Sequence, residues 1–181
     1  PYLKRLEIAG NGLNKVWITR DIPLLEYVDI SNNQIDNIDL LIYHAPNISL
    51  LKSSNNQLTK MWSAGLQKLS YLDLSNNKLS LIDPVSRNPV LKHFDVSGNL
   101  VGDFYPLNHN DLYVQLEYLN LQDNPASLES YDDFYPLFKS KVDTFLQTEM
   151  FEPVVPCYPS PFRNTFIHEK EVNLSWSVGS E

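Results

Sequence analysis

Apolar residues recur at a fixed spacing along the first part of the chain, and an asparagine closes each copy of the pattern. The clearest copy spans residues 69–79, where leucine occupies the first, fourth, sixth and eleventh positions and Asn77 the ninth. Equivalent asparagines follow one another at intervals of 21 to 25 residues, which marks an internal repeat. The six asparagines are Asn11, Asn33, Asn56, Asn77, Asn99 and Asn124.

Three apolar residues precede each asparagine, and Ser53 is the one polar exception. A single repeat cannot bury its own apolar side, so we expect consecutive repeats to stack and to share one core. The short apolar segment before each asparagine predicts a parallel strand, because a parallel ladder satisfies the backbone groups of stacked copies.

The spacing Leu-x-x-Leu-x-Leu-x-x-Asn-x-Leu, present in six copies, resembles the leucine-rich repeat family. The resemblance implies an α/β fold, a leucine-rich-repeat solenoid with a curved parallel sheet and with irregular chain and 3₁₀ turns on the convex side. Prolines between the repeats agree, because Pro23, Pro46, Pro84 and Pro89 disfavour long helices there. We expect the asparagine amides to turn inward and bond backbone groups, since a buried amide is costly without partners.

The pattern divides the chain into three segments. We predict an array of six leucine-rich repeats over residues 1–128, which ends because Glu129 stands where an apolar side chain would enter the core. Residues 129–150 should form a C-terminal capping helix, since apolar side chains recur with helical spacing over 132–149. Residues 151–181 begin with a proline-rich stretch and predict an extended tail packed on the cap.

Two features bear on association with another chain. The first repeat has no capping sequence before it, and a cap or further repeats, a partner or a second copy would cover its open edge. Cys157 is the single cysteine, so the sequence predicts no internal disulfide. It is a buried or idle thiol, one half of an interchain disulfide, or a nucleophile, and no accompanying histidine and asparagine or aspartate pattern favours the last.

Residues that alternate with the apolar strand positions should point away from the core, onto the concave face of the sheet. They form two columns across the repeats, one largely aromatic and one largely acidic. Rigid aromatic side chains bury much area at little entropic cost, which favours a protein-binding surface, and an ordinary solvated sheet face is the alternative. The aromatic column is Arg5, Tyr27, Leu50, Tyr71, His93 and Tyr118, and the acidic column is Glu7, Asp29, Lys52, Asp73, Asp95 and Asn120.

Composition argues against several partner classes. The 181-residue chain has a net charge of −8, a pI near 4.9 and no basic cluster, so nucleic acid and anionic membranes are poor partners. Its apolar runs are shorter than the roughly 18 to 20 residues that span a bilayer, so we expect no membrane insertion. The N-terminus also lacks the pattern of a signal peptide.

No pattern predicts a reaction centre, a cofactor or a metal site. Asp73 and Asp95 are close enough to form a carboxylate pair or a calcium site, but an open sheet face supplies too few ligands and excludes no water. The four histidines and Cys157 lack the spacing of zinc ligands. We therefore expect no enzyme activity.

Other features bear on the cellular compartment. The sequons at Asn47 and Asn173 predict glycosylation if the chain enters the secretory route. An Asp-Asp-Phe-Tyr helix start at 132–135, then a cysteine, then Pro-Ser-Pro-Phe at 159–162 resemble, in this order, the leucine-rich immune proteins of mosquitoes. That resemblance implies haemolymph immunity, complement-like partners and an interchain disulfide, although this chain lacks that group's coiled coil and further cysteines.

These patterns together predict a non-enzymatic protein-protein recognition module that uses the concave face. It would be an extracellular innate-immunity or receptor-type protein, able to form a homodimer or heterodimer through Cys157 or the open edge. The alternative is a cytosolic leucine-rich-repeat scaffold or regulatory subunit, which the absence of a disulfide framework favours.

Overall fold

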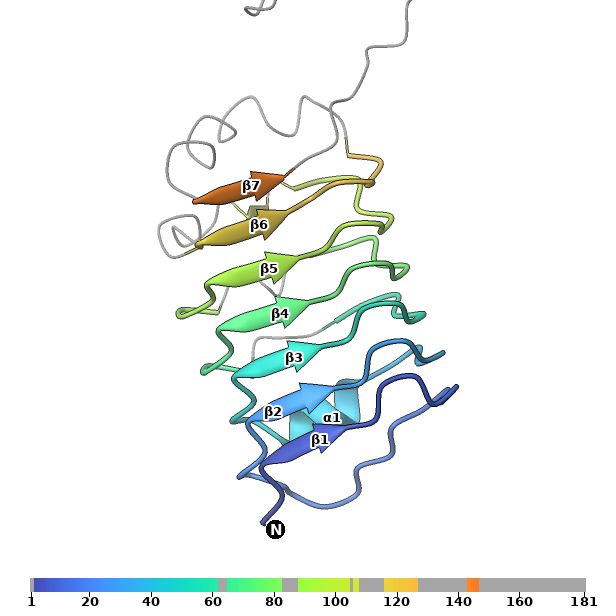
Figure 1. Ribbon diagram of the computed structural model, residues 1–181, viewed down its shortest axis with the longest axis vertical. Coiled ribbons are helices and arrows are strands. Elements are labelled where there is room, and N and C mark those ends of the chain that lie inside the picture. Colours follow the sequence, from blue (N-terminus) through green and yellow to red (C-terminus); the bar gives the residue numbers. More distant parts are fainter. Residues whose placement is uncertain are drawn as a thin grey trace, which may run out of the picture. The chain divides into compact units, whose positions relative to one another are not determined.

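Parallel strands of three residues each form one sheet in the computed structural model, and they follow one another in chain order from β1 to β7 (Figure 1). The structure describes residues 2–61, 65–82, 88–104, 106–107, 116–126 and 143–146. The strands are β1 (Arg5–Glu7), β2 (Tyr27–Asp29), β3 (Leu50–Lys52), β4 (Tyr71–Asp73), β5 (His93–Asp95), β6 (Tyr118–Asn120) and β7 (Thr144–Leu146).

The middle residue of each strand from β1 to β6 points into the core. Leu51, Leu72 and Phe94 pair with one another across adjacent strands and are fully buried. Leucine, isoleucine and valine side chains from the other repeat positions complete one continuous core. In the first repeat the equivalent side chains, including Leu6 and Ile8, are only partly buried. Stacking of repeats therefore buries the apolar positions, as the spacing predicts.

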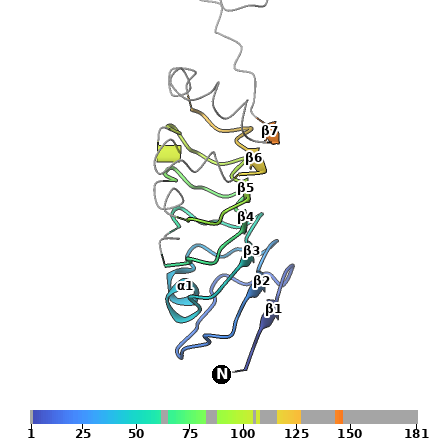
Figure 2. The ribbon, with the colours of Figure 1, turned by 90° about the vertical axis from the view of Figure 1, so that its left-hand side faces the viewer.

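The segments that return from one strand to the next lie across the core from the sheet. One of them contains α1 (Asp39–His44), a six-residue helix whose Leu41 and Ile42 are buried. Figure 2 shows α1 and the strands on opposite sides of the core. The other described return segments are irregular, with a short 3₁₀ turn at 106–107. The parallel-sheet solenoid is thus confirmed, and the described part of the chain contains no long helix.

The repeat asparagines form a ladder of buried amides, as expected. Asn77 is typical: its Oδ1 accepts from the Leu58 N–H at 2.9 Å, and its Nδ2 donates to Ser53 O at 2.9 Å and to Leu74 O at 3.0 Å. The residue before each ladder asparagine has a positive φ between 53° and 70°. Glycine, asparagine and aspartate tolerate that conformation best, which explains why only these residue types occur there.

The predicted capping helix is wrong at its C-terminal end. Thr144–Leu146 form β7, which pairs in parallel with β6. The Thr144 N–H donates to Glu117 O at 2.9 Å, and the Leu121 N–H donates to Leu146 O at 2.7 Å. A further strand satisfies backbone groups that the edge of β6 would leave unpaired, so the sheet continues beyond the sixth repeat. Apart from Asp143, the rest of segment 129–150 lies outside the described residues.

The chain divides into two units, residues 1–150 and residues 151–181. The whole second unit, and with it the predicted proline-rich tail, lies outside the described residues. Within the ranges that the structure describes, no helix has the length and apolar character needed to cross a membrane.

Candidate functional site

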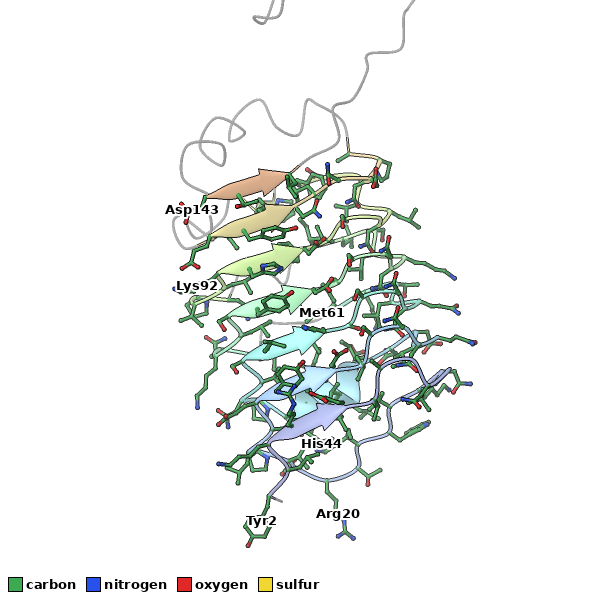
Figure 3. All side chains as sticks on the ribbon, in the orientation of Figure 1. Tyr2, Arg20, His44, Met61, Lys92 and Asp143 are labelled. Carbon is green, nitrogen blue, oxygen red and sulfur yellow. The ribbon has the colours of Figure 1, made fainter. Side chains whose placement is uncertain are left out.

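The two predicted columns lie side by side on the sheet face opposite the core, where the side chains of the strands project in Figure 3. The register pairs the first residue of each strand with its neighbours, from Arg5 in β1 to Tyr118 in β6. The third residues pair in the same way, from Glu7 to Asn120. All twelve predicted positions are thus brought together on one face, which we call the open face.

Three aromatic rings form a continuous stack over β4, β5 and β6. The ring centroids of Tyr71 and His93 are 4.0 Å apart with 9° between the ring planes, and those of His93 and Tyr118 are 4.1 Å apart with 5°. Nearly parallel rings at such a separation must overlap face to face. Both faces of His93 are therefore covered. At each end of the stack, one ring face has no described ring stacked on it: the face of Tyr71 toward Leu50 and the face of Tyr118 toward Thr144.

A separate aromatic contact lies at the other end of the column. The Cζ atom of Arg5 lies 3.5 Å from the ring centroid of Tyr27, and the Arg5 guanidinium is also paired with Glu7 of its own strand. A guanidinium over a tyrosine ring is attracted by the negative face of that ring. Leu50 of β3 stands between this pair and the three-ring stack, so the aromatic column is interrupted at one strand.

The aspartates of the acidic column are oriented by the turn that follows each strand. The Oδ1 atom of Asp73 accepts from the Ser75 N–H at 3.0 Å and from the Ser75 hydroxyl at 2.7 Å. Asp29 and Asp95 make the same two bonds to the serine two residues later. The recurring Asp-x-Ser spacing is a sequence signal for this turn, and the repeat pattern alone does not reveal it.

Burial and neighbouring carboxylates shift the pKa values of the stacked rings. Burial lowers the pKa of His93 below its ordinary 6.5, although Asp95 and Asp73 oppose the shift. Burial, and then Asp73 and Asp95, raise the pKa of Tyr71, and burial followed by Asp95 raises the pKa of Tyr118. The stack is therefore uncharged at neutral pH, and the charge of the open face resides in the acidic column.

The open face carries a negative charge. Four carboxylates and two basic side chains stand in the two columns, and one of the basic side chains, Arg5, is paired with Glu7. The other described ion pairs join residues outside the columns. Across the described ranges, no lysine or arginine forms an ion pair with Asp29, Asp73 or Asp95.

Of the remaining predicted site residues, the structure describes Asn47, which precedes β3 and belongs to neither column. The Nδ2 of Asn47 donates to a backbone carbonyl of the preceding repeat at 2.8 Å, and the Ser49 hydroxyl donates to another at 3.1 Å. Both polar residues of this sequon therefore have a structural role at the start of β3. Asn173 and Cys157 lie outside the described residues. The described part of the chain contains no group of three His, Cys, Asp or Glu side chains placed to hold a metal ion.

A hollow beside α1 was not evident from the sequence pattern. It measures about 560 Å³ and is lined largely by apolar side chains, among them Leu40, Tyr43 and Met61. The two charged residues in its described lining, Asp39 and Lys60, are paired with each other at 3.5 Å. Such a wall offers apolar contact rather than groups for acid–base chemistry.

Comparisons with known proteins agree with this architecture. The family model described as Leucine Rich Repeat matches residues 68–88, the repeat that contains β4. Leucine-rich repeat-containing protein 23 of Bos taurus is 32% identical over 100 residues, which cover 54% of this chain and 28% of that protein. U2 small nuclear ribonucleoprotein A' of Mycosarcoma maydis is 33% identical over 114 residues, which cover 60% and 40%.

A solved structure of an internalin from Listeria monocytogenes superposes with a TM-score of 0.61 at 27% identity, over 72% of this chain and 40% of that one. This chain thus spans less than half the length of each of these proteins. Together with the strand register and the asparagine ladder, these matches identify the described array as a leucine-rich-repeat solenoid.

Proposed function

We propose that this chain is a non-enzymatic protein-recognition module that binds its partner on the open face. The observation that carries the proposal is the strip of stacked rings beside oriented carboxylates over β4, β5 and β6. Rings held by stacking, and carboxylates held by the following turn, lose little conformational entropy when a partner binds. Extended sheet surfaces are also what solenoids commonly use to bind other proteins.

The same face is poorly suited to catalysis. An open sheet excludes no water, so its polar groups cannot act in the low-dielectric setting that reaction centres use. The pKa values of Tyr71 and Tyr118 are raised, which makes both hydroxyls weaker nucleophiles at neutral pH. Recognition therefore accounts for these residues better than chemistry does.

Affinity capture from the native source tests this function. The full chain is compared with a Tyr71→Ala, Asp73→Lys double variant and with a matched Tyr43→Ala, Asp36→Lys variant, which alters the same residue types away from the open face. We expect the open-face variant to lose its partner and the matched variant to keep it, with both folded by circular dichroism. Equal capture by all three proteins would remove the open face from consideration.

We further propose that the module is secreted, as an innate-immunity or receptor-type binding protein. The two sequons and the resemblance of the C-terminal third to secreted immune proteins support this compartment. The second candidate is a scaffold subunit inside the cell. It is favoured by the similarity to U2 small nuclear ribonucleoprotein A', and by the structural roles that Asn47 and Ser49 have without a glycan.

Mass spectrometry of the endogenous protein separates the two compartments. A glycan on Asn47 or Asn173 supports secretion, whereas unmodified asparagine at both positions supports the intracellular scaffold. Non-reducing electrophoresis of the same sample reports whether Cys157 joins two chains. A disulfide-linked dimer that disappears in a Cys157→Ser variant supports the secreted module, and a reduced monomer counts against it.

A further inference from the structure

We propose that the open face recognises an extended basic segment of the partner protein, and that an arginine of this segment stacks on Tyr71 above Leu50 and pairs with Asp73. The inference rests on the proposed function, and it adds the chemistry of the partner and the place where its anchoring side chain lies.

The sign of the charge sets the class of partner. Asp73 and Asp95 are register partners on adjacent strands, about 5 Å apart, and Asp29 stands two strands away. No described lysine or arginine pairs with any of the three. A row of like charges repels an acidic ligand and attracts a basic one, so charge complementarity selects a basic segment.

The stacking of the rings indicates where the partner's arginine side chain lies. His93 has a ring stacked on each face, so over β4 and β5 the ring face on which no described ring stacks is that of Tyr71 on the side of Leu50. The chain itself provides the precedent, because the Arg5 guanidinium lies over Tyr27 from one strand before it. An incoming arginine above Leu50 would hold the same place relative to Tyr71, since Leu50 is the register partner of Tyr71 on the preceding strand.

The hydrogen bonds of the two aspartates indicate which carboxylate pairs with the arginine. Asp95 already accepts a bond on Oδ2 from the amide of Asn120 at 3.0 Å. Asp73 uses Oδ1 for Ser75, and among the described residues no hydrogen bond is made to its Oδ2. Asp73 also shares a strand and a sheet face with Tyr71, which is the relation that Glu7 has to Arg5. One planar guanidinium can therefore stack on the ring and bond the carboxylate, which a lysine ammonium does less well.

Lys52 provides a further test of where the arginine binds. It follows Leu50 by two residues on the same face, so its charge opposes a cation placed above Leu50. The position is accordingly one where attraction by Asp73 and repulsion by Lys52 compete. Removing the lysine charge with Lys52→Gln should therefore strengthen binding of a basic segment rather than weaken it.

The test titrates the full chain with three acetylated and amidated octapeptides, (Gly-Arg)₄, (Gly-Lys)₄ and (Gly-Glu)₄, at low and physiological salt. We expect (Gly-Arg)₄ to bind most tightly, (Gly-Lys)₄ more weakly and (Gly-Glu)₄ not at all, with affinity falling as salt rises. Tyr71→Ala and Asp73→Asn should each weaken (Gly-Arg)₄ by about 3- to 10-fold. The matched variants Tyr43→Ala and Asp36→Asn should bind as the parent does.

Asp73→Asn tests the effect of charge alone, because an amide oxygen can accept the hydrogen bond of the turn at this position. Asn120 occupies the equivalent position in β6 and accepts from the Gln122 N–H at 3.2 Å. The substitution thus removes charge while it keeps a turn acceptor. Similar affinity for (Gly-Arg)₄ and (Gly-Glu)₄, or unchanged affinity in both open-face variants, overturns the inference.

Peptide titration and affinity capture together distinguish an error in the assigned partner chemistry from an error in the proposed function. If the basic peptides do not bind while the open-face variant still loses its native partner in affinity capture, the open face remains the recognition surface and the assigned chemistry is wrong. If native capture is also unchanged, the proposed function itself is wrong.

Discussion

Asn77 is the position where the contribution of the asparagine ladder to stability can be measured most directly. The residue is only 7% exposed and belongs to the central repeat of the array. Asn77→Ala would leave the buried Leu58 N–H without its acceptor and would remove the amide that donates to Ser53 O and Leu74 O. An orphaned buried donor costs about 1 to 3 kcal/mol and each lost bond about 1 kcal/mol, so we expect a loss of about 3 to 5 kcal/mol in the free energy of unfolding.

The chain contains a matched control for this substitution. Asn11 occupies the same repeat position, but it is exposed, and its described side-chain bond runs from Nδ2 to Ala9 O at 3.0 Å. No buried group would be orphaned, so Asn11→Ala should lower the free energy of unfolding by less than about 1 kcal/mol.

Urea unfolding followed by circular dichroism measures both losses, and amide hydrogen exchange measures the local effect. The Leu58 amide should exchange much faster in Asn77→Ala, because Asn77 Oδ1 is its hydrogen-bond acceptor in the described structure. A loss below about 1 kcal/mol for Asn77→Ala, or one equal to that for Asn11→Ala, would refute the ladder as a source of stability.

Three further outcomes are expected. Gly98→Ala should destabilise by about 1 kcal/mol or more in urea unfolding, since φ is 62° and the new Cβ would meet the Asn76 side chain, whereas Gly102→Ala meets nothing within 4 Å and should change little. Ser53→Ala should stabilise by about 1 kcal/mol, because the buried Ser53 hydroxyl has no hydrogen-bond partner among the described residues; a loss of stability would contradict this. His93 has a pKa below 6.5 in the folded state, so the unfolded state binds more protons as pH falls through 6.5, and stability should fall there. Unfolding of His93→Phe at the same pH values should show a smaller loss, and an equal loss would contradict the assignment.

The repeat itself was predictable because its positions are constrained one by one. Buried apolar side chains, the amide ladder and the alternation along each strand all recur with the same spacing, so the sequence alone assigns Leu72 to the core and Tyr71 to the open face. The same reasoning did not predict β7. When the β6–β7 register is used to align the repeats, Gln147 stands where the third apolar residue is expected and Met150 stands where the asparagine is expected. The apolar residues of the same segment also recur with helical spacing, which favoured the helix prediction.

The geometry of the open face was less predictable than its composition. Sequence placed His93 between two tyrosines in one column, but only the structure shows that the three rings overlap face to face and that no described ring stacks on the Leu50 side of Tyr71. Likewise, the sequence contains Asp-x-Ser three times, yet which carboxylate oxygen remains available depends on side-chain rotamers that the repeat does not fix.

The third repeat departs from the pattern at three neighbouring positions. Leu50 interrupts the aromatic column, Lys52 interrupts the acidic column, and the buried Ser53 hydroxyl has no hydrogen-bond partner among the described residues. Departures from local rules concentrate at functional sites, where stability is given up for function. If these departures had no such role, restoring the pattern with Leu50→Tyr would leave partner binding unchanged. If β3 receives the partner's arginine, the new ring would stack on the side of Tyr71 that the arginine needs, and binding would be lost although the aromatic column has grown. The absence of an aromatic ring at residue 50 would then determine the specificity of this solenoid.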